Sequence, residues 1–210
     1  ERLAEYASLG AKFCKWRNVI LIGENLPTDA NLLESARIHA EYAYMCQEAG
    51  LVPIVEPEVL MDGGHDIGAC KEASTKTLTV VFEALVKRGV AIEGMILKTN
   101  IVVAGKELRK ASPKEVSEAT VAVFKKTLPD NLPGQAFLSG GQGDVEATEN
   151  LNAIAKLGPF PWNISFSYGR ALQDKPLKTW AGKAENVVAA QQALLHRAKM
   201  NGLATLGQYD

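Results

Sequence analysis

The feature that most constrains the fold of this 210-residue chain is a regular alternation of short apolar runs with longer segments of helical periodicity. We expect strands at residues 15–22, 51–59, 94–101, 135–139 and 163–168. Helices are expected at residues 29–48, 69–87, 144–156 and 184–200, and another opens at Ser112-Pro113 with Glu115 in capping-box spacing. Five successive strand–helix units are typical of parallel βαβ folds, in which helices cover a buried sheet.

Two architectures share this alternation: the doubly wound open sheet and the (β/α)8 TIM barrel. The segment after the first strand, Gly23-Glu24-Asn25-Leu26-Pro27, lacks a dinucleotide-binding glycine fingerprint. Polar residues instead gather at several strand ends, as the catalytic face of a barrel requires. A closed barrel has eight units, so we expect residues 1–210 to be a partial barrel, strands four to eight, with about three units before Glu1.

The composition narrows the functional class. The chain carries 23 Lys and Arg against 24 Asp and Glu, well mixed, which argues against a nucleic-acid or membrane partner. Its apolar runs are too short to cross a membrane. Three cysteines without metal-ligand spacing fit a reducing compartment. The chain opens at Glu1 without a methionine, signal region or transit pattern, so we expect a piece of a longer polypeptide.

Lys98 ends the apolar stretch 94–97 and is the candidate nucleophile. A lysine at a strand end more often extends to solvent, but a neutral, desolvated lysine can form a Schiff base with a carbonyl substrate. Alternate residues of a strand share a face, so Lys15 and Arg17 point the same way, as do Glu56 and Glu58. Three neighbouring strands therefore aim charged groups at one side of the sheet.

This set predicts imine chemistry, with Asn100 expected on the same face as Lys98. A second cation nearby, Lys15 or Arg17, together with burial, would favour the neutral amine. Loss of water from the carbinolamine needs a general acid, which Glu56 or Glu58 could supply.

The last two strands predict an anion site. Ser139-Gly140-Gly141 ends one strand, and Ser167-Tyr168-Gly169-Arg170 ends the next. Glycines after strands let backbone N–H groups approach an anion, and arginine supplies a forked donor. The loops after the final two strands of a barrel commonly hold phosphate.

These segments together identify a family resemblance. The resemblance extends through essentially the whole chain. The segments that carry it, in order, are residues 15–17, 50–58, 62–66, 93–98, 137–142, 150–154 and 166–173. The chain resembles class I fructose-bisphosphate aldolase, the metal-free, Schiff-base type.

The resemblance implies a role for each matching position. Lys98 is similar to the Schiff-base lysine, Glu56 to the general acid/base, and Glu58 to the carboxylate that supports the lysine network. Lys15 matches the lysine that assists carbinolamine dehydration, and Arg17 the arginine at the mouth of the site. The positions that hold the ketose 1-phosphate are matched by Ser139, Gly140, Gly141, Ser167, Gly169 and Arg170.

The implied reaction is reversible cleavage of fructose 1,6-bisphosphate to dihydroxyacetone phosphate and glyceraldehyde 3-phosphate. The resemblance implies no metal cofactor, a homotetramer, and a cytosolic location, or a plastid one in plants. Two alternatives stay open at this point: a non-catalytic fragment serving as a structural or binding piece, and a Schiff-base aldolase of different substrate range.

The chain departs from the family at three places. Thr99 follows Lys98, where the family usually has proline, and this changes the local backbone rigidity. A catalytic aspartate and the residues for the sugar 6-phosphate are expected before Glu1, and a tyrosine-ending tail after Asp210.

We expect His65 to stabilise a surface loop rather than ligate a metal. Val187, Ala190, Leu194 and Ala198 form a stripe expected in the core or a subunit contact.

Overall fold

Five parallel strands form the single sheet of the computed structural model, which describes residues 1–210. They are β1 (Phe13–Ile20), β2 (Val52–Val59), β3 (Ile96–Thr99), β4 (Gly134–Phe137) and β5 (Asn163–Phe166). Each strand pairs with the next one along the chain, in the order β1-β2-β3-β4-β5. A doubly wound sheet would reverse direction at a switch point, and none occurs here.

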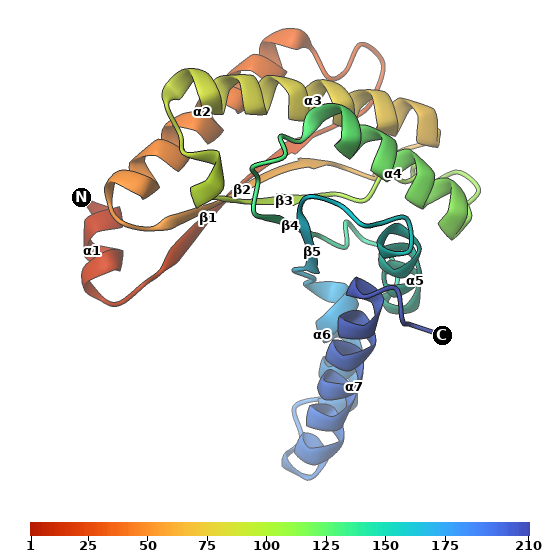
Figure 1. The fold of residues 1–210 in the computed structure, drawn as a ribbon. Helices are drawn as coiled ribbons and strands as arrows, with labels where there is room; N and C mark the ends of the chain where they lie inside the picture. Colours follow the sequence, from red (N-terminus) through yellow and green to blue (C-terminus); the bar gives the residue numbers. More distant parts are fainter.

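Helices connect these strands in the expected alternation (Figure 1). They are α1 (Arg2–Ser8), α2 (Asp29–Glu48), α3 (Ile67–Arg88), α4 (Pro113–Thr127), α5 (Asp144–Ala155), α6 (Arg170–Trp180) and α7 (Val187–Thr205). Single 3-10 turns occupy Ile92–Gly94 and Ala184–Asn186. In Figure 1, α2, α3 and α4 lie side by side on one face of the sheet. The predicted α/β fold class is confirmed, and the assignment to barrel strands four to eight stays a prediction.

The helix starts follow local capping chemistry. Thr28 and Asp66 cap α2 and α3 with their side-chain oxygens. Ser112 and Glu115 form the predicted capping box at the start of α4, with Pro113 as its first residue. Each cap satisfies backbone N–H groups that the first helical turn leaves without partners. No helix combines the length and apolar content needed to span a membrane.

Two helices were not expected from the sequence, α1 and α6. Pro176 lies inside α6, and proline within a polar segment normally indicates a loop. In the structure α6 instead packs against α7, and the two extend together away from the sheet (Figure 1). The helix matters for the site because it begins at Arg170, directly after Gly169.

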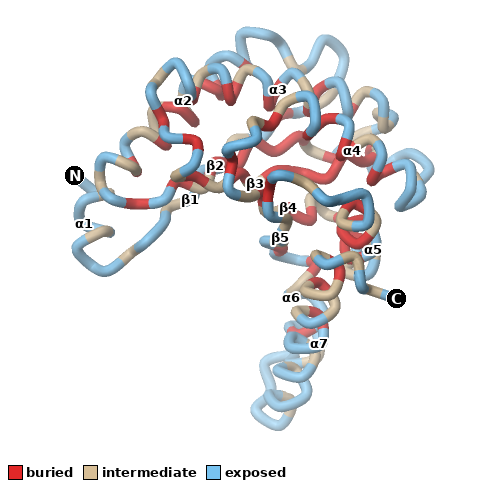
Figure 2. Tube along the Cα trace, viewed as in Figure 1, coloured by how far each residue is buried: buried red, intermediate tan, exposed pale blue.

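The core lies between the sheet and the helices that cover it (Figure 2). Val55, Leu97 and Phe137 point from three neighbouring strands into this layer, and each is fully buried. Phe124 of α4 stacks on Phe137 with ring centroids 5.5 Å apart. Because side chains alternate along a strand, Glu56 and Lys98 then point to the opposite face.

The expectation that Asn100 shares the face of Lys98 is wrong. Strand β3 ends at Thr99, so the alternation of side chains does not continue to the next residue. The Asn100 amide donates to Ser74 Oγ of α3 at 3.2 Å, and its carbonyl oxygen accepts from Val59 N–H at 3.0 Å. Burial explains this orientation, because a buried amide must find hydrogen-bond partners.

The predicted apolar stripe of α7 is not core. Val187 and Leu194 are exposed, whereas Ala190 and Ala198 are half-buried. The wider apolar side chains of the stripe therefore face outward, and a subunit contact through them stays a prediction.

His39 on α2 is a fully buried titratable group behind the sheet. Its Nδ1 lies 2.9 Å from the carbonyl oxygen of Ser35. Burial lowers the pKa of His39 to about 4, with backbone hydrogen bonding at Ser35 and Glu56 opposing the shift. The imidazole is therefore neutral in the folded protein at neutral pH.

Acidification is expected to destabilise the fold through His39. Between its unfolded pKa of 6.5 and its folded pKa of about 4, the unfolded chain binds more protons than the folded one. The contribution of neutral His39 to the free energy of unfolding is complete above the upper value. It is lost as the pH falls through this interval, by up to about 3 kcal/mol. Urea unfolding at pH 7 and pH 4 measures the loss, and His39→Leu is expected to show a smaller loss by that amount. An equal loss in both proteins would contradict the assignment.

Candidate active site

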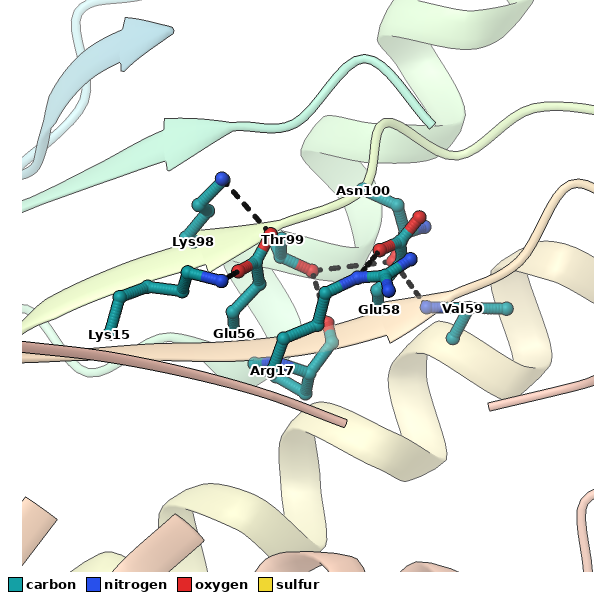
Figure 3. Close-up of polar contacts among 9 residues, drawn as sticks. Lys15, Arg17, Glu56, Glu58, Val59, Lys98, Thr99 and Asn100 are labelled. Carbon is teal, nitrogen blue, oxygen red and sulfur yellow. Dashed lines mark hydrogen bonds and ion pairs between the residues drawn. The ribbon is translucent and has the colours of Figure 1, made fainter. Parts of the chain in front are cut away.

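Glu56 of β2 lies between two lysines on the open face of the sheet (Figure 3). Its Oε1 is 3.0 Å from Lys98 Nζ of β3, and its Oε2 is 3.1 Å from Lys15 Nζ of β1. The Glu56 side chain is 3% exposed and that of Lys98 15%, whereas Lys15 is 43% exposed. A buried carboxylate with two cations at contact distance is electrostatically matched, since each charge has a partner.

A second ion pair lies beside the first. Arg17 Nε donates to Glu58 Oε2 at 2.5 Å, and this bond raises the pKa of Arg17. The parallel register explains both pairings, because Cα of Arg17 pairs with Glu56 and Cα of Lys15 with Ile54. Each cation therefore reaches the carboxylate two residues further along β2. Glu58 contacts Arg17 and makes no ion pair with Lys98.

Thr99, the residue after Lys98, bonds β3 to β2. Its buried hydroxyl donates to the carbonyl oxygen of Pro57 at 3.3 Å. Its own carbonyl oxygen accepts from Leu138 N–H at 3.0 Å. Thr99 is therefore bonded on one side to β2 and on the other to the end of β4. These bonds restrain the backbone beside Lys98, the candidate nucleophile.

The predicted anion-binding segments meet at the carboxyl ends of β4 and β5. Ser167 N–H donates to the carbonyl oxygen of Phe137 at 2.8 Å, so the two strand ends continue side by side. Gly140 and Gly141 adopt φ of 60° and 103°, a left-handed turn that other residues rarely take. Such a turn exposes successive backbone N–H groups.

The start of α6 adds a feature that the sequence did not predict. Gly169 is its N-cap residue and Arg170 its first residue. The first N–H groups of the helix and the positive end of its dipole therefore lie at Arg170 in the chain. Arg170 also lines a groove of about 510 Å³ with Gln142 and Gly143, which follow the Gly140–Gly141 turn.

The structure brings together two groups of predicted site residues. Lys15, Glu56 and Lys98 form one, with Arg17 and Glu58 beside them. The strand-end residues form the other: Ser139, Gly140, Gly141, Ser167, Gly169 and Arg170. No hydrogen bond or ion pair of the structure joins Lys98 to the second group.

His65 lies in the loop after β2, as expected. Its carbonyl oxygen accepts from Gly105 N–H at 2.8 Å, which bonds this loop to the one after β3. Burial lowers the pKa of His65, which favours the neutral ring. No group of three or more His, Cys, Asp or Glu side chains is placed to hold a metal ion.

Removing the Arg17 guanidinium is expected to destabilise the protein. In Arg17→Met the buried Glu58 carboxylate keeps its place without its charged partner, which costs about 1–3 kcal/mol in the free energy of unfolding. Half-exposure of Arg17 favours the lower end of that interval.

Arg37→Met provides the matched control, because the Arg37–Glu34 pair on α2 has similar contact lengths and both of its side chains are exposed. Urea unfolding of both variants is the measurement. We expect no measurable change for Arg37→Met, and equal stability of the two variants would show that Glu58 does not depend on Arg17.

Parallel strands joined by covering helices, with charged groups on the open face and glycine turns at the strand ends, define the class of (β/α) barrel proteins. The sequence model described as "Glycolytic: Fructose-bisphosphate aldolase class-I" matches residues 1–210. The chain belongs to the class I fructose-bisphosphate aldolase family, and the resemblance stated from its sequence is confirmed.

Named relatives agree with this assignment. The chain is 51% identical over 211 residues to the cytoplasmic isozyme of fructose-bisphosphate aldolase from Spinacia oleracea, covering 100% of this chain and 59% of that protein. It is 50% identical to a probable fructose-bisphosphate aldolase class 1 of Xanthomonas axonopodis pv. citri, covering 99% of this chain and 63% of that protein.

A solved structure of fructose-bisphosphate aldolase from Plasmodium falciparum, in complex with TRAP and a small molecule inhibitor, superimposes with a TM-score of 0.97. The two chains are 50% identical, and the match covers 100% of this chain and 61% of the other. The chain thus spans about three fifths of the length of the relatives it matches.

Proposed function

We propose that the intact protein is a class I fructose-bisphosphate aldolase that cleaves fructose 1,6-bisphosphate reversibly through a Schiff base on Lys98. The observation that carries the proposal is the contact of 3.0 Å between Lys98 Nζ and the buried Glu56 carboxylate. An amine that must lose a proton before it attacks needs a base at this distance.

The proposed reaction begins with transfer of a proton from the Lys98 ammonium to Glu56. The freed Nζ lone pair attacks the ketone carbon, and the carbonyl oxygen takes up the proton that Nζ releases as the C–N bond forms, which gives a carbinolamine. Protonated Glu56 then returns its proton to the hydroxyl, which leaves as water while the C=N bond forms. The iminium accepts the electron pair of the adjacent carbon–carbon bond as that bond breaks, while the hydroxyl on the departing carbon gives its proton to the Glu56 carboxylate and becomes the aldehyde carbonyl. Glu56 then returns this proton to the enamine carbon, and water hydrolyses the resulting iminium to release the ketone and free Lys98.

Lys15 supports this series of steps from β1. Glu56 Oε2 lies near Lys15 Nζ, yet it makes no hydrogen bond and is buried. We propose that this oxygen accepts a proton from a substrate hydroxyl. Lys15 is the more exposed amine, and its ammonium stays beside Glu56 while Lys98 is the neutral amine that attacks the ketone.

The substrate phosphate is proposed to bind at the strand-end residues. The Gly140–Gly141 turn presents N–H groups, Ser139 and Ser167 bring hydroxyls, and Arg170 at the start of α6 brings a forked cation. These donors favour a phosphorylated ketose over an uncharged one.

The surroundings of the reaction are also proposed from the family. We infer metal-free chemistry, a homotetramer, and a location in the cytoplasm, as in the relatives named cytoplasmic isozymes. The alternative of a non-catalytic fragment is not favoured, because the named relatives are aldolases.

Borohydride trapping tests the nucleophile. Incubation of the intact protein with dihydroxyacetone phosphate and borohydride is expected to reduce the imine to a stable secondary amine on Lys98. Mass spectrometry of peptides locates the adduct. Lys98→Met removes the amine and is expected to abolish the adduct, whereas Lys12→Met, at an exposed lysine just before β1, is expected to retain it. An adduct on another lysine, or none, would sink the proposal.

Replacing Glu56 tests the proton carrier. Glu56→Gln keeps the side-chain shape and removes the exchangeable carboxyl proton, so kcat is expected to fall about 10²–10⁴-fold. Steady-state cleavage rates measure the effect. Glu118→Gln, at an exposed carboxylate on α4, is the control and should leave kcat unchanged. A Glu56→Gln enzyme with more than a tenth of the normal kcat would assign the proton transfer to another group.

A further inference from the structure

Lys106, in the loop after β3, lies against the glycine turn at the end of β4. A Cβ atom placed on Gly141 would lie 3.2 Å from Lys106 Cε and 3.4 Å from its Nζ. A hollow of about 110 Å³ at this point is lined by Lys106, Gly141 and Met61, among others. The lysine ammonium is therefore next to backbone that the proposed function assigns to phosphate.

The backbone holds Lys106 at this point. Its N–H donates to the carbonyl oxygen of Met61 at 2.9 Å. Gly105 N–H donates to the carbonyl oxygen of His65 at 2.8 Å. A Cβ on Gly105 would lie 2.2 Å from the carbonyl oxygen of Gly63, so only glycine permits this approach. The loops after β2 and β3 are thus bonded together, and Lys106 is presented to the loop after β4.

Asp62 is the present partner of Lys106. Its Oδ1 accepts from Lys106 Nζ at 2.8 Å, and the two side chains are 54% and 41% exposed. The Lys106 hydrogen bond holds the pKa of Asp62 below its usual value, and the charge of Arg170 contributes. Asp62 therefore lies within the field of both cations.

An exposed pair of this kind contributes little net stability, because water solvates both charges well. A phosphate dianion carries twice the charge of Asp62 and offers several acceptor oxygens. Exchange of the carboxylate for such a ligand is therefore electrostatically favourable. Lys106 can make it without backbone movement, since only the end of its flexible side chain has to turn.

We propose that Lys106 binds the substrate phosphate beside the Gly140–Gly141 turn, exchanging Asp62 for the phosphate, and so favours phosphorylated ketoses over unphosphorylated ones. This inference rests on the proposed function for the identity of the ketose. It adds to the predicted anion site a cation that the sequence did not indicate.

Lys110 provides a matched control on the same loop. It lines the same hollow and pairs with Glu146 Oε2 at 2.5 Å, but the atoms nearest a Cβ on Gly141 belong to Lys106 and Met61. Lys106→Gln and Lys110→Gln remove the same charge from two exposed positions. A difference between them therefore reports the location of the ammonium rather than the net charge of the protein.

The test compares three ligands in the intact protein: inorganic phosphate by calorimetry, and dihydroxyacetone phosphate and dihydroxyacetone by borohydride trapping. Lys106→Gln is expected to weaken the affinity for inorganic phosphate and for dihydroxyacetone phosphate about tenfold. The trapping of dihydroxyacetone is expected to stay unchanged. KM for fructose 1,6-bisphosphate should rise with kcat preserved. Lys110→Gln should change each affinity less than about twofold.

Asp62→Asn frees Lys106 and is expected to strengthen phosphate binding about threefold, only while Lys106 is present. If Asp62→Asn strengthens phosphate binding equally in the Lys106→Gln background and in the unaltered protein, the proposed exchange of Asp62 for phosphate is overturned. Equal phosphate affinity of Lys106→Gln and the unaltered protein overturns the site. Phosphate binding that depends on Lys106, in a protein that traps neither ketone, would support the site and refute the aldolase proposal.

Discussion

The arrangement depends on one buried carboxylate, Glu56, which holds cations from two neighbouring strands at contact distance. Taking a carboxylate out of water is costly, and only close counter-charges offset that cost. The parallel register of β1 with β2 supplies one of them, because it sets Lys15 diagonally opposite Glu56. Lys98 supplies the other from β3. The same offset pairs Arg17 with Glu58, so one register accounts for both ion pairs.

The loops at the carboxyl ends of neighbouring strands contact one another. Gly105 bonds the loop after β3 to His65, and Lys106 then lies against Gly141 in the loop after β4. Ser167 N–H bonds the end of β5 to Phe137. Backbone contacts therefore hold the proposed anion-binding groups at the edge of the sheet where the strands end.

Most of the fold could be predicted from local patterns. Apolar runs and capping residues such as Thr28 and Ser112 depend on neighbours in the chain, and their signals survived in the structure. Helix α6 could not be predicted, because the packing of α6 on α7 outweighs the local effect of Pro176. Asn100 was placed on the wrong face, since the end of strand pairing depends on a neighbouring strand.

The sequence by itself determined the alternating architecture, the family, and which side chains of β1, β2 and β3 share a face. Strand periodicity is a local property of the backbone, so Lys15, Glu56 and Lys98 could be grouped without coordinates. Tertiary structure decided the pairings: Glu58 with Arg17 rather than Lys98, and Lys106 with Asp62 beside Gly141. These pairings depend on register and on loops meeting across long separations in the chain, which no local pattern encodes.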